Sequence, residues 1–171
     1  MESLKALLDR EREAECVRLI RDKVPEEHAD ALCVRGHGMQ NLTVIDIGID
    51  CQARVNELDA HELGHHVSTV TLQHIFAGLP LNLFAMDPDT AGKFEARADR
   101  TAASITVSPE RIIEAYAEGC REPYEFAEAL EITEKAYLAG IELQRSRYGT
   151  RQFYHLGYRL TFEPLAIESA S

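Results

Sequence analysis

The chain has 171 residues, of which 45% are hydrophobic and 27% are charged. This composition is typical of a globular protein with a hydrophobic core, and it excludes a disordered, collagen-like or low-complexity chain. Acidic residues outnumber Lys and Arg by 29 to 18, which gives a formal net charge of −11 and argues against a nucleic-acid-binding surface spread over the fold.

The cysteines and the first residues predict the compartment. Cys16, Cys33, Cys51 and Cys120 form no Cys-x-x-Cys pair, and residues 1–11 mix acidic and basic side chains, unlike a secretory signal. We therefore expect buried, unpaired thiols and a cytoplasmic protein. No apolar run approaches the roughly 20 residues that span a bilayer, so we expect no membrane partner.

The first half of the chain predicts an α+β fold. A loose helical period over residues 3–22 predicts an N-terminal helix that stops before Pro25. Residues 32–35 and 42–49 are short runs with β-branched content, separated by a turn at residues 36–38. They predict a small antiparallel sheet.

The rest of the chain is predicted to be mainly helical. A helix begins near Asn56, the expected N-cap, with Asp59 at N3. A second core helix carries Phe94 and Ile105 at helical spacing, and Ser108 followed by a proline starts a third, which ends near residue 119.

Two further helices over residues 123–131 and 133–148 and an extended segment or hairpin over residues 151–162 complete the chain. We expect three parts: a core domain over residues 1–107, a helical subdomain over 108–150 and a C-terminal extended tail over 151–171.

The residues His61-Glu62-Leu63-Gly64-His65 form a His-Glu-x-x-His motif within a predicted helix. Side chains four positions apart leave the same face of a helix, so His61 and His65 can bind one Zn²⁺ together. Glu62 lies beside that face, where its carboxylate can accept a proton from water without binding the metal. Composition alone predicts about 0.03 accidental matches to this motif in the chain. The alternative is a pair of helix histidines packed without a metal.

Two histidines leave a site incomplete, because catalytic zinc usually has three protein ligands and one water. Ser68 and Thr71 stand where a longer metalloprotease motif needs Gly and His, so that class is excluded. Glu95 on the second helix can be the third ligand, and Asp99, one turn later, can accept the free N–H of a ligating imidazole. The alternatives are a solvated carboxylate at Glu95 and an ion pair between Asp99 and an arginine.

Other residues near the motif carry weaker predictions. Gly64 costs about 1 kcal/mol in a helix relative to Ala, which predicts close approach of another helix or backbone. His66 lies about 100° around the helix axis from the preceding histidine and should face away from the metal. Metal-assisted hydrolysis of a carbonyl group also needs a side chain that stabilises the negative charge developing on the carbonyl oxygen. Three candidates stay open for this role: Tyr116, His74 and His37.

The chain resembles the ImmA/IrrE family of zinc-dependent metallopeptidases, which are encoded by phages, integrative elements and bacterial chromosomes. The resemblance covers about residues 3–148 and rests on His61-Glu62-Leu63-Gly64-His65-His66 followed by Glu95-Ala96-Arg97-Ala98-Asp99-Arg100-Thr101-Ala102-Ala103. It implies a zincin-like fold with His61, His65 and Glu95 as zinc ligands and Glu62 as the catalytic base. The chain departs from the family at residues 104–109, where members commonly have an acidic residue, an apolar pair and Pro.

The family's best-understood role is cleavage of a partner transcriptional repressor, which relieves repression of a mobile element or of stress genes. The resemblance therefore implies a helix-turn-helix repressor as substrate, whereas the residues themselves indicate metal-assisted hydrolysis and no more. Two other functions stay open: a regulator that docks a repressor without cutting it, and the toxin of a toxin–antitoxin pair. The presence of Glu62 favours the peptidase, because docking needs no base.

The C-terminal part carries segments of opposite charge. Residues 125–148 resemble a helix-turn-helix, but eight Glu and two Arg between positions 110 and 134 give a local charge of −6, which repels phosphate. We expect a structural or protein-docking role there and no direct nucleic-acid binding. Residues 143–162 carry four Arg among aromatic side chains; we favour a hairpin that packs its aromatic side on the core over a surface for nucleic acid or protein.

Overall fold

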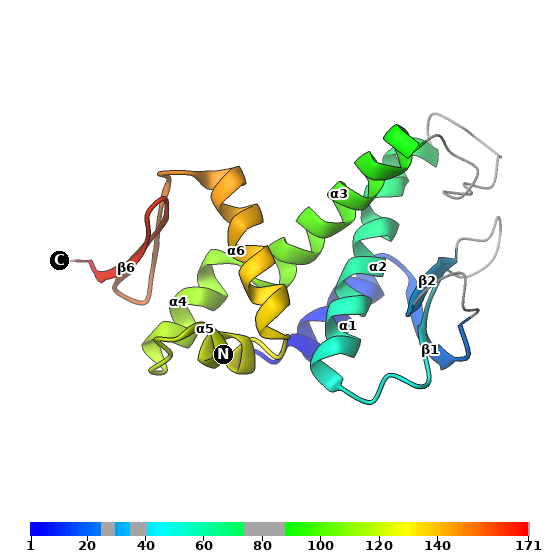
Figure 1. The fold of residues 1–171 in the computed structure, drawn as a ribbon, viewed down its shortest axis with the longest axis horizontal. Helices are drawn as coiled ribbons and strands as arrows, with labels where there is room; N and C mark the ends of the chain where they lie inside the picture. The colour runs from blue at the N-terminus through cyan, green and yellow to red at the C-terminus, as the bar shows by residue number, and fades with distance from the viewer. Residues whose placement is uncertain (25–29, 35–40, 74–87, 171) are drawn as a thin grey trace.

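The computed structural model describes residues 1–24, 30–34, 41–73 and 88–170. The helices are α1 (Leu4–Ala14), α2 (Gln52–Gln73), α3 (Pro88–Thr106), α4 (Pro109–Ala117), α5 (Pro123–Ala129) and α6 (Glu134–Tyr148). The strands are β1 (Val17–Asp22), β2 (Ala31–Val34), β3 (Asn41–Asp46), β4 (Gln152–His155), β5 (Tyr158–Phe162) and β6 (Leu165–Ser169). The predicted α+β class is confirmed. Figure 1 shows the two small sheets at opposite ends of the long axis with helices between them.

The N-terminal helix is shorter than predicted. It ends at Ala14, and residues 17–22 form β1. Cys16 has a φ of 53°, a left-handed conformation that stops a right-handed helix. The residues that follow then pair with β3, Val17 opposite Asn41. The weak helical periodicity of residues 17–22 is outweighed by their β-branched side chains and by the backbone hydrogen bonds that pair them with β3.

The first sheet has the order β1-β3-β2, so β2 is an edge strand. β2 and β3 are antiparallel, as predicted, but β1 is parallel to β3 and makes the sheet mixed. β3 ends earlier than predicted, at Asp46, whose carboxylate accepts hydrogen bonds from the backbone N–H groups of Val24 and Gly48. The predicted turn at residues 36–38 lies outside the described residues.

The helix with the His-Glu-x-x-His motif starts earlier than predicted. α2 begins at Gln52, so Asn56 is not its N-cap. Asn56 is 4% exposed, and its side-chain amide donates a hydrogen bond to the carbonyl of Glu131 over 2.9 Å. Asp59 lies inside the helix and forms an ion pair with Arg12 of α1. Both polar side chains bind distant partners, which a local capping pattern cannot reveal.

The helices after α2 follow the prediction. α3 buries Phe94 and Ala98, in agreement with its predicted apolar face. The hydroxyl of Ser108 caps α4 by accepting a hydrogen bond from the Arg111 N–H, and Thr133 caps α6 in the same way. These starts are correct because a cap depends on residues only three positions away.

The main core lies where the helices meet β5. Its fully buried side chains include Leu4, Leu8, Leu63, Ile112, Leu130, Leu160 and Phe162. Arg111 is buried beside them, and its guanidinium donates hydrogen bonds to the carbonyls of Glu2, Thr106 and Leu130. These bonds join the N-terminus, the end of α3 and the end of α5, and so hold the scaffold behind the site.

The C-terminal segment forms a second sheet with the antiparallel order β4-β5-β6. The predicted packing of its aromatic side on the core is confirmed: Phe162 is fully buried, and the ring of Phe153 lies 6.0 Å from it. Arg151 lies 5.4 Å from the centre of the Phe153 ring, and Arg159 forms an ion pair with Glu168. These two arginines therefore have partners within the sheet.

The thiols are less buried than predicted. Cys16 and Cys51 are exposed, and Cys120 is half-buried. Cys16 follows α1 and Cys51 precedes α2, positions at which the chain turns at the surface. None of these three forms a disulfide.

Candidate metal centre

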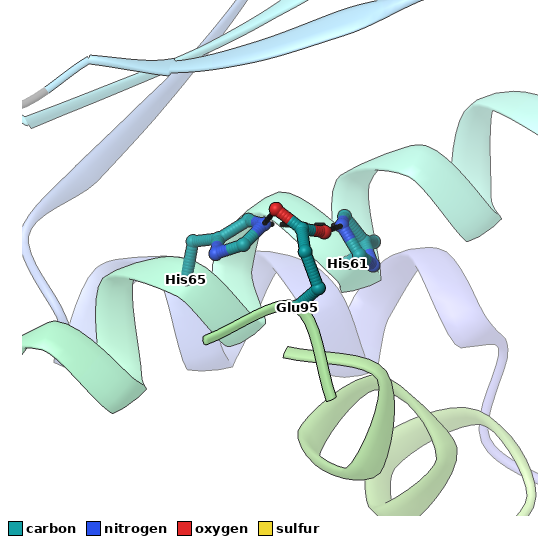
Figure 2. A group of neighbouring side chains, drawn as sticks. All are labelled: His61, His65 and Glu95. Atoms are coloured by element: carbon teal, nitrogen blue, oxygen red, sulfur yellow. Dashed lines mark hydrogen bonds and ion pairs between the residues drawn. The ribbon is translucent and has the colours of Figure 1, made fainter. Parts of the chain in front are cut away.

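Both histidines of the motif leave α2 on the side that meets α3 (Figure 2). The ring centroids of His61 and His65 are 4.7 Å apart. Glu95 of α3 faces both rings, with Oε2 at 3.2 Å from His61 Nε2 and Oε1 at 3.5 Å from His65 Nε2. The structure thus brings together the three residues that the sequence predicts as ligands.

These three side chains fit a metal ion. The two Nε2 atoms are 3.1 Å apart, and the three ligand atoms lie within 4.8 Å of one another. Bonds of about 2.0–2.1 Å in a tetrahedral arrangement put ligand atoms roughly 3.3 Å apart, close to the 3.1 Å between the two Nε2 atoms. Two imidazoles and one carboxylate are also a known donor set for catalytic zinc.

Asp99 holds the other nitrogen of His61. The Nδ1 atom of His61 is 3.0 Å from Asp99 Oδ1. If Nδ1–H donates to this carboxylate, the Nε2 lone pair points to the metal position. The hydrogen bond from His61 lowers the pKa of Asp99. Burial lowers the pKa of His61, but Asp99 and the neighbouring carboxylates outweigh burial and raise the pKa overall.

His65 has the opposite electrostatic balance. It is 4% exposed, and burial lowers its pKa, with the nearby positive charge of His61 acting in the same direction. A neutral imidazole is the form that binds a metal ion. The two histidines are therefore prepared for metal binding in different ways. A hydrogen bond to Asp99 orients the ring of His61, and burial favours the uncharged form of His65.

Glu62 lies next to the triad in a buried position. Its side chain is 7% exposed, and it lines the same cleft as the two histidines and Glu95. Its carboxylate makes no hydrogen bond with any residue that the structure describes. Burial raises the pKa of Glu62 to about 7, although the charge of His61 acts against this rise. A carboxyl group with this pKa can both accept and release a proton near neutral pH.

Close packing at Gly64 brings the two helices together. A Cβ atom at Gly64 would lie 2.5 Å from the carbonyl oxygen of Ala98. The predicted close approach of another backbone at this glycine is therefore confirmed. His65 follows Gly64 and Asp99 follows Ala98, so this contact sets the distance between residues of the site.

We expect Gly64→Ala to lower the free energy of unfolding by about 1–3 kcal/mol and to weaken metal binding, because the added methyl group pushes α3 away. The intrinsic helix preference of Ala, about 1 kcal/mol, acts in the opposite direction. Urea denaturation and metal analysis measure the two effects. Gly92→Ala is the matched control, and it should leave metal binding unchanged. Among the described residues, no atom outside the adjacent part of α3 lies within 4 Å of the position that the added methyl group would take. Equal behaviour of the two variants contradicts the packing argument.

His66 faces away from the triad, as predicted. It is fully buried, with Nε2 at 3.2 Å from the carbonyl oxygen of Leu42 and 3.4 Å from Cys33 Sγ. These contacts join α2 to β3 and β2. His66 therefore supports the position of the motif helix on the sheet.

Tyr116 is wrong as a candidate for oxyanion stabilisation. Its ring packs edge-on against Tyr158 at 5.4 Å, and the guanidinium of Arg121 lies 3.8 Å from its centre. It is not among the described residues that line the cleft with the triad. The other two candidates, His37 and His74, lie outside the described residues.

The triad lines a cleft of about 1200 Å³. The described lining residues come mainly from β2, α2, α3 and α6. Figure 1 shows β2 and α6 on opposite sides of the α2–α3 pair. The contribution of α6 to this cleft was not predicted from the sequence, although Ala136, Ala139, Gly140 and Leu143 recur at the spacing of one helix face. The spacing shows that these residues share one face of the helix, but it does not show which part of the molecule that face contacts.

No protein-family model, curated protein or solved structure matches this chain. Among residues 1–24, 30–34, 41–73 and 88–170, no helix combines the length and apolar composition that a membrane crossing requires.

Proposed function

We propose that this chain is a zinc-dependent metallopeptidase. The observation that carries the proposal is the convergence of His61, His65 and Glu95 beside the buried Glu62 in one large cleft. A metal bound only for stability needs no base, whereas hydrolysis needs a group that takes a proton from water. A cleft of about 1200 Å³ also has room for part of a polypeptide.

The chain's own groups supply the proton transfers. When bound, zinc would polarise the carbonyl of the scissile bond and lower the pKa of water toward about 7. Glu62 accepts a proton as the water oxygen adds to the carbonyl carbon. It then donates this proton to the leaving nitrogen as the C–N bond breaks, which releases a carboxylic acid and an amine. A pKa of about 7 for Glu62 suits both directions of transfer.

We expect Asp99→Ala to weaken zinc binding or activity by about 10- to 100-fold without unfolding the chain, because His61 loses the acceptor that orients its ring. Competition with a chelating dye measures the zinc affinity. Asp89→Ala, which removes an exposed carboxylate from the first turn of the same helix, is the control and should leave the affinity unchanged. Unchanged affinity and activity in Asp99→Ala would make Asp99 an ordinary surface carboxylate.

We also propose a zincin-like arrangement and a repressor as substrate. The contacts of α2 with β2 and β3 support the first, since they place the motif helix under a small sheet. The resemblance of residues 61–66 and 95–103 to the ImmA/IrrE family supports a helix-turn-helix repressor as the partner. α5 and α6 retain the order of a helix-turn-helix, but the glutamates of this region favour a structural or protein-docking role over DNA binding.

The test combines a peptide library with the repressor encoded nearest to this chain. The purified, zinc-loaded protein is incubated with each, and mass spectrometry identifies the products. We expect specific cleavage that a chelator abolishes and added zinc restores. The absence of cleavage in both substrates at full zinc loading contradicts the peptidase proposal.

A further inference from the structure

The outer face of α3 carries a line of positive charge. Lys93, Arg97 and Arg100 follow one another at spacings of four and three residues, which places them on one face of the helix. Arg97 is two positions from both Glu95 and Asp99, so it lies nearly opposite these residues around the helix axis. The line is therefore on the side of α3 away from the triad. All three cations are exposed, and none forms an ion pair with a described residue.

The last turn of α6 extends this line. Arg147 donates a hydrogen bond to the hydroxyl of Ser104 over 2.9 Å, and Ser104 lies four residues after Arg100 on the same face of α3. The guanidinium of Arg147 also lies 4.9 Å from the centre of the Tyr148 ring, and these two contacts orient it. Its remaining N–H donors make no hydrogen bond with a described residue. We call these four side chains the cationic stripe: Lys93, Arg97, Arg100 and Arg147.

Helix packing separates the charges of α3. Its carboxylates Glu95 and Asp99 line the cleft, whereas its cations face outward. Asp89, in the first turn, is the acidic residue of α3 that shares the outer face. Charges more than about 8 Å away are largely screened at physiological ionic strength. The local excess of cations therefore decides what this face attracts, although the chain as a whole carries a net charge of −11.

The cationic stripe lacks the apolar anchors of a protein interface. Among the described residues, the exposed large hydrophobic side chains include none from α3 and only Leu138 from α6. Leu138 is nine positions from Arg147, which puts it on the opposite side of α6. Protein interfaces depend on buried aromatic and aliphatic anchors, whereas nucleic-acid interfaces are more polar and much more positively charged. Three of the four cations are arginines, whose planar guanidinium can bind two phosphate oxygens at once.

We propose that the cationic stripe binds the phosphate backbone of a nucleic acid without reading its sequence. Contacts of Lys and Arg with phosphates supply affinity and carry no sequence information. The glutamates of residues 110–134 predict no direct nucleic-acid binding in that region, but the stripe depends on how α3 packs against α6. The inference is independent of the proposed peptidase function, since none of the four cations is among the described residues that line the cleft.

Fluorescence anisotropy of the zinc-loaded full chain tests the stripe with three labelled probes. These are a short DNA duplex of arbitrary sequence, a single-stranded RNA of the same length and a polyglutamate peptide of similar charge. Four phosphate contacts predict a slope of roughly −3 to −4 in a plot of log affinity against log salt for the duplex, or a loss of about 100-fold between about 50 and 200 mM salt. We expect polyglutamate to bind at least about 10-fold more weakly than the nucleic acids.

Two double variants locate the binding surface. Lys93→Glu combined with Arg97→Glu should weaken duplex binding by about 10-fold or more and reduce the salt slope by about 2, because two phosphate contacts are lost. Lys5→Glu combined with Arg18→Glu is the matched control, since these exposed cations of α1 and β1 also form no ion pair with a described residue. Both double variants change the net charge by the same amount, so a difference between them reports the position of the charge. Circular dichroism checks that both are folded.

The outcomes separate the possible partners. Binding of DNA, of RNA or of both that the stripe variant weakens and the control retains supports the inference and identifies the nucleic acid. Equal affinity of the two double variants, or no binding of either nucleic acid at about 50 mM salt, overturns it. Polyglutamate binding as tight as that of the nucleic acids also overturns it and assigns the stripe to an acidic protein segment. Peptide hydrolysis should be the same in the stripe variant and the wild type, so either proposal can fail while the other stands.

Discussion

Glu62→Gln should lower the rate of peptide hydrolysis by about 10²- to 10⁴-fold while zinc content stays that of the wild type. Glutamine keeps the size of the side chain and can still form hydrogen bonds, but it cannot accept the proton of the attacking water. Glu62 is not one of the three predicted ligands, so this substitution leaves the ligand set intact. Initial rates on a cleaved peptide and elemental analysis of the same samples measure both quantities.

A matched control separates the site from a general loss of charge. Glu128→Gln removes a carboxylate from an exposed position of α5 and should leave hydrolysis unchanged. Co-expression of the wild type or of Glu62→Gln with the neighbouring repressor extends the test to the cell. Intact repressor and equal derepression with both forms would falsify the catalytic role of Glu62 and favour a regulator that only docks.

His65→Ala should reduce bound zinc from about one ion per chain to nearly none. Catalytic zinc usually has three protein ligands, and the loss of one leaves a pair that binds weakly. His65 is 4% exposed, and its Nε2 atom lies close to both His61 Nε2 and Glu95. An alanine at this position removes one of the three ligand atoms. Elemental analysis of protein purified without added zinc gives the measurement, and circular dichroism checks that the variant is folded.

His155→Ala is the matched control for the loss of an imidazole. His155 lies on β4, where Nε2 is 3.1 Å from Glu114 Oε1. Its removal should leave the zinc content at the wild-type value. Equal zinc in His65→Ala and in the wild type refutes the ligand assignment and restores the alternative of two packed helix histidines.

The amino-acid sequence by itself determined the features that depend on neighbours within a few residues. The four-residue spacing of His61 and His65 puts both on one helix face in any α-helix. The caps at Ser108 and Thr133 depend on a backbone N–H group three positions later. Gly64 predicted a close helix contact, because glycine destabilises a helix relative to alanine and is expected there only where a larger residue would not fit.

The tertiary structure alone decided the features that depend on partners far along the chain. β1 pairs with β3 over residues 17–22, and the local β-branched side chains do not reveal which distant strand is the partner. The sequence predicts Asn56 as a helix cap, but its side chain donates a hydrogen bond to the carbonyl of Glu131. The ring of Tyr116, a candidate for oxyanion stabilisation, packs against the ring of Tyr158. Non-local contacts of this kind outweigh weak local propensities because they bring burial and hydrogen bonds together.

The candidate site shows both kinds of information in one place. The motif residues and the identity of Glu95 as a third ligand candidate were readable from the sequence, because few residue types bind metal and one turn separates Glu95 from Asp99. The distances from Glu95 to both histidines and the apolar wall formed by α6 were not readable. They depend on how closely α2, α3 and α6 pack, which is set at Gly64 and Gly140 by contacts with backbone and side chains many residues away.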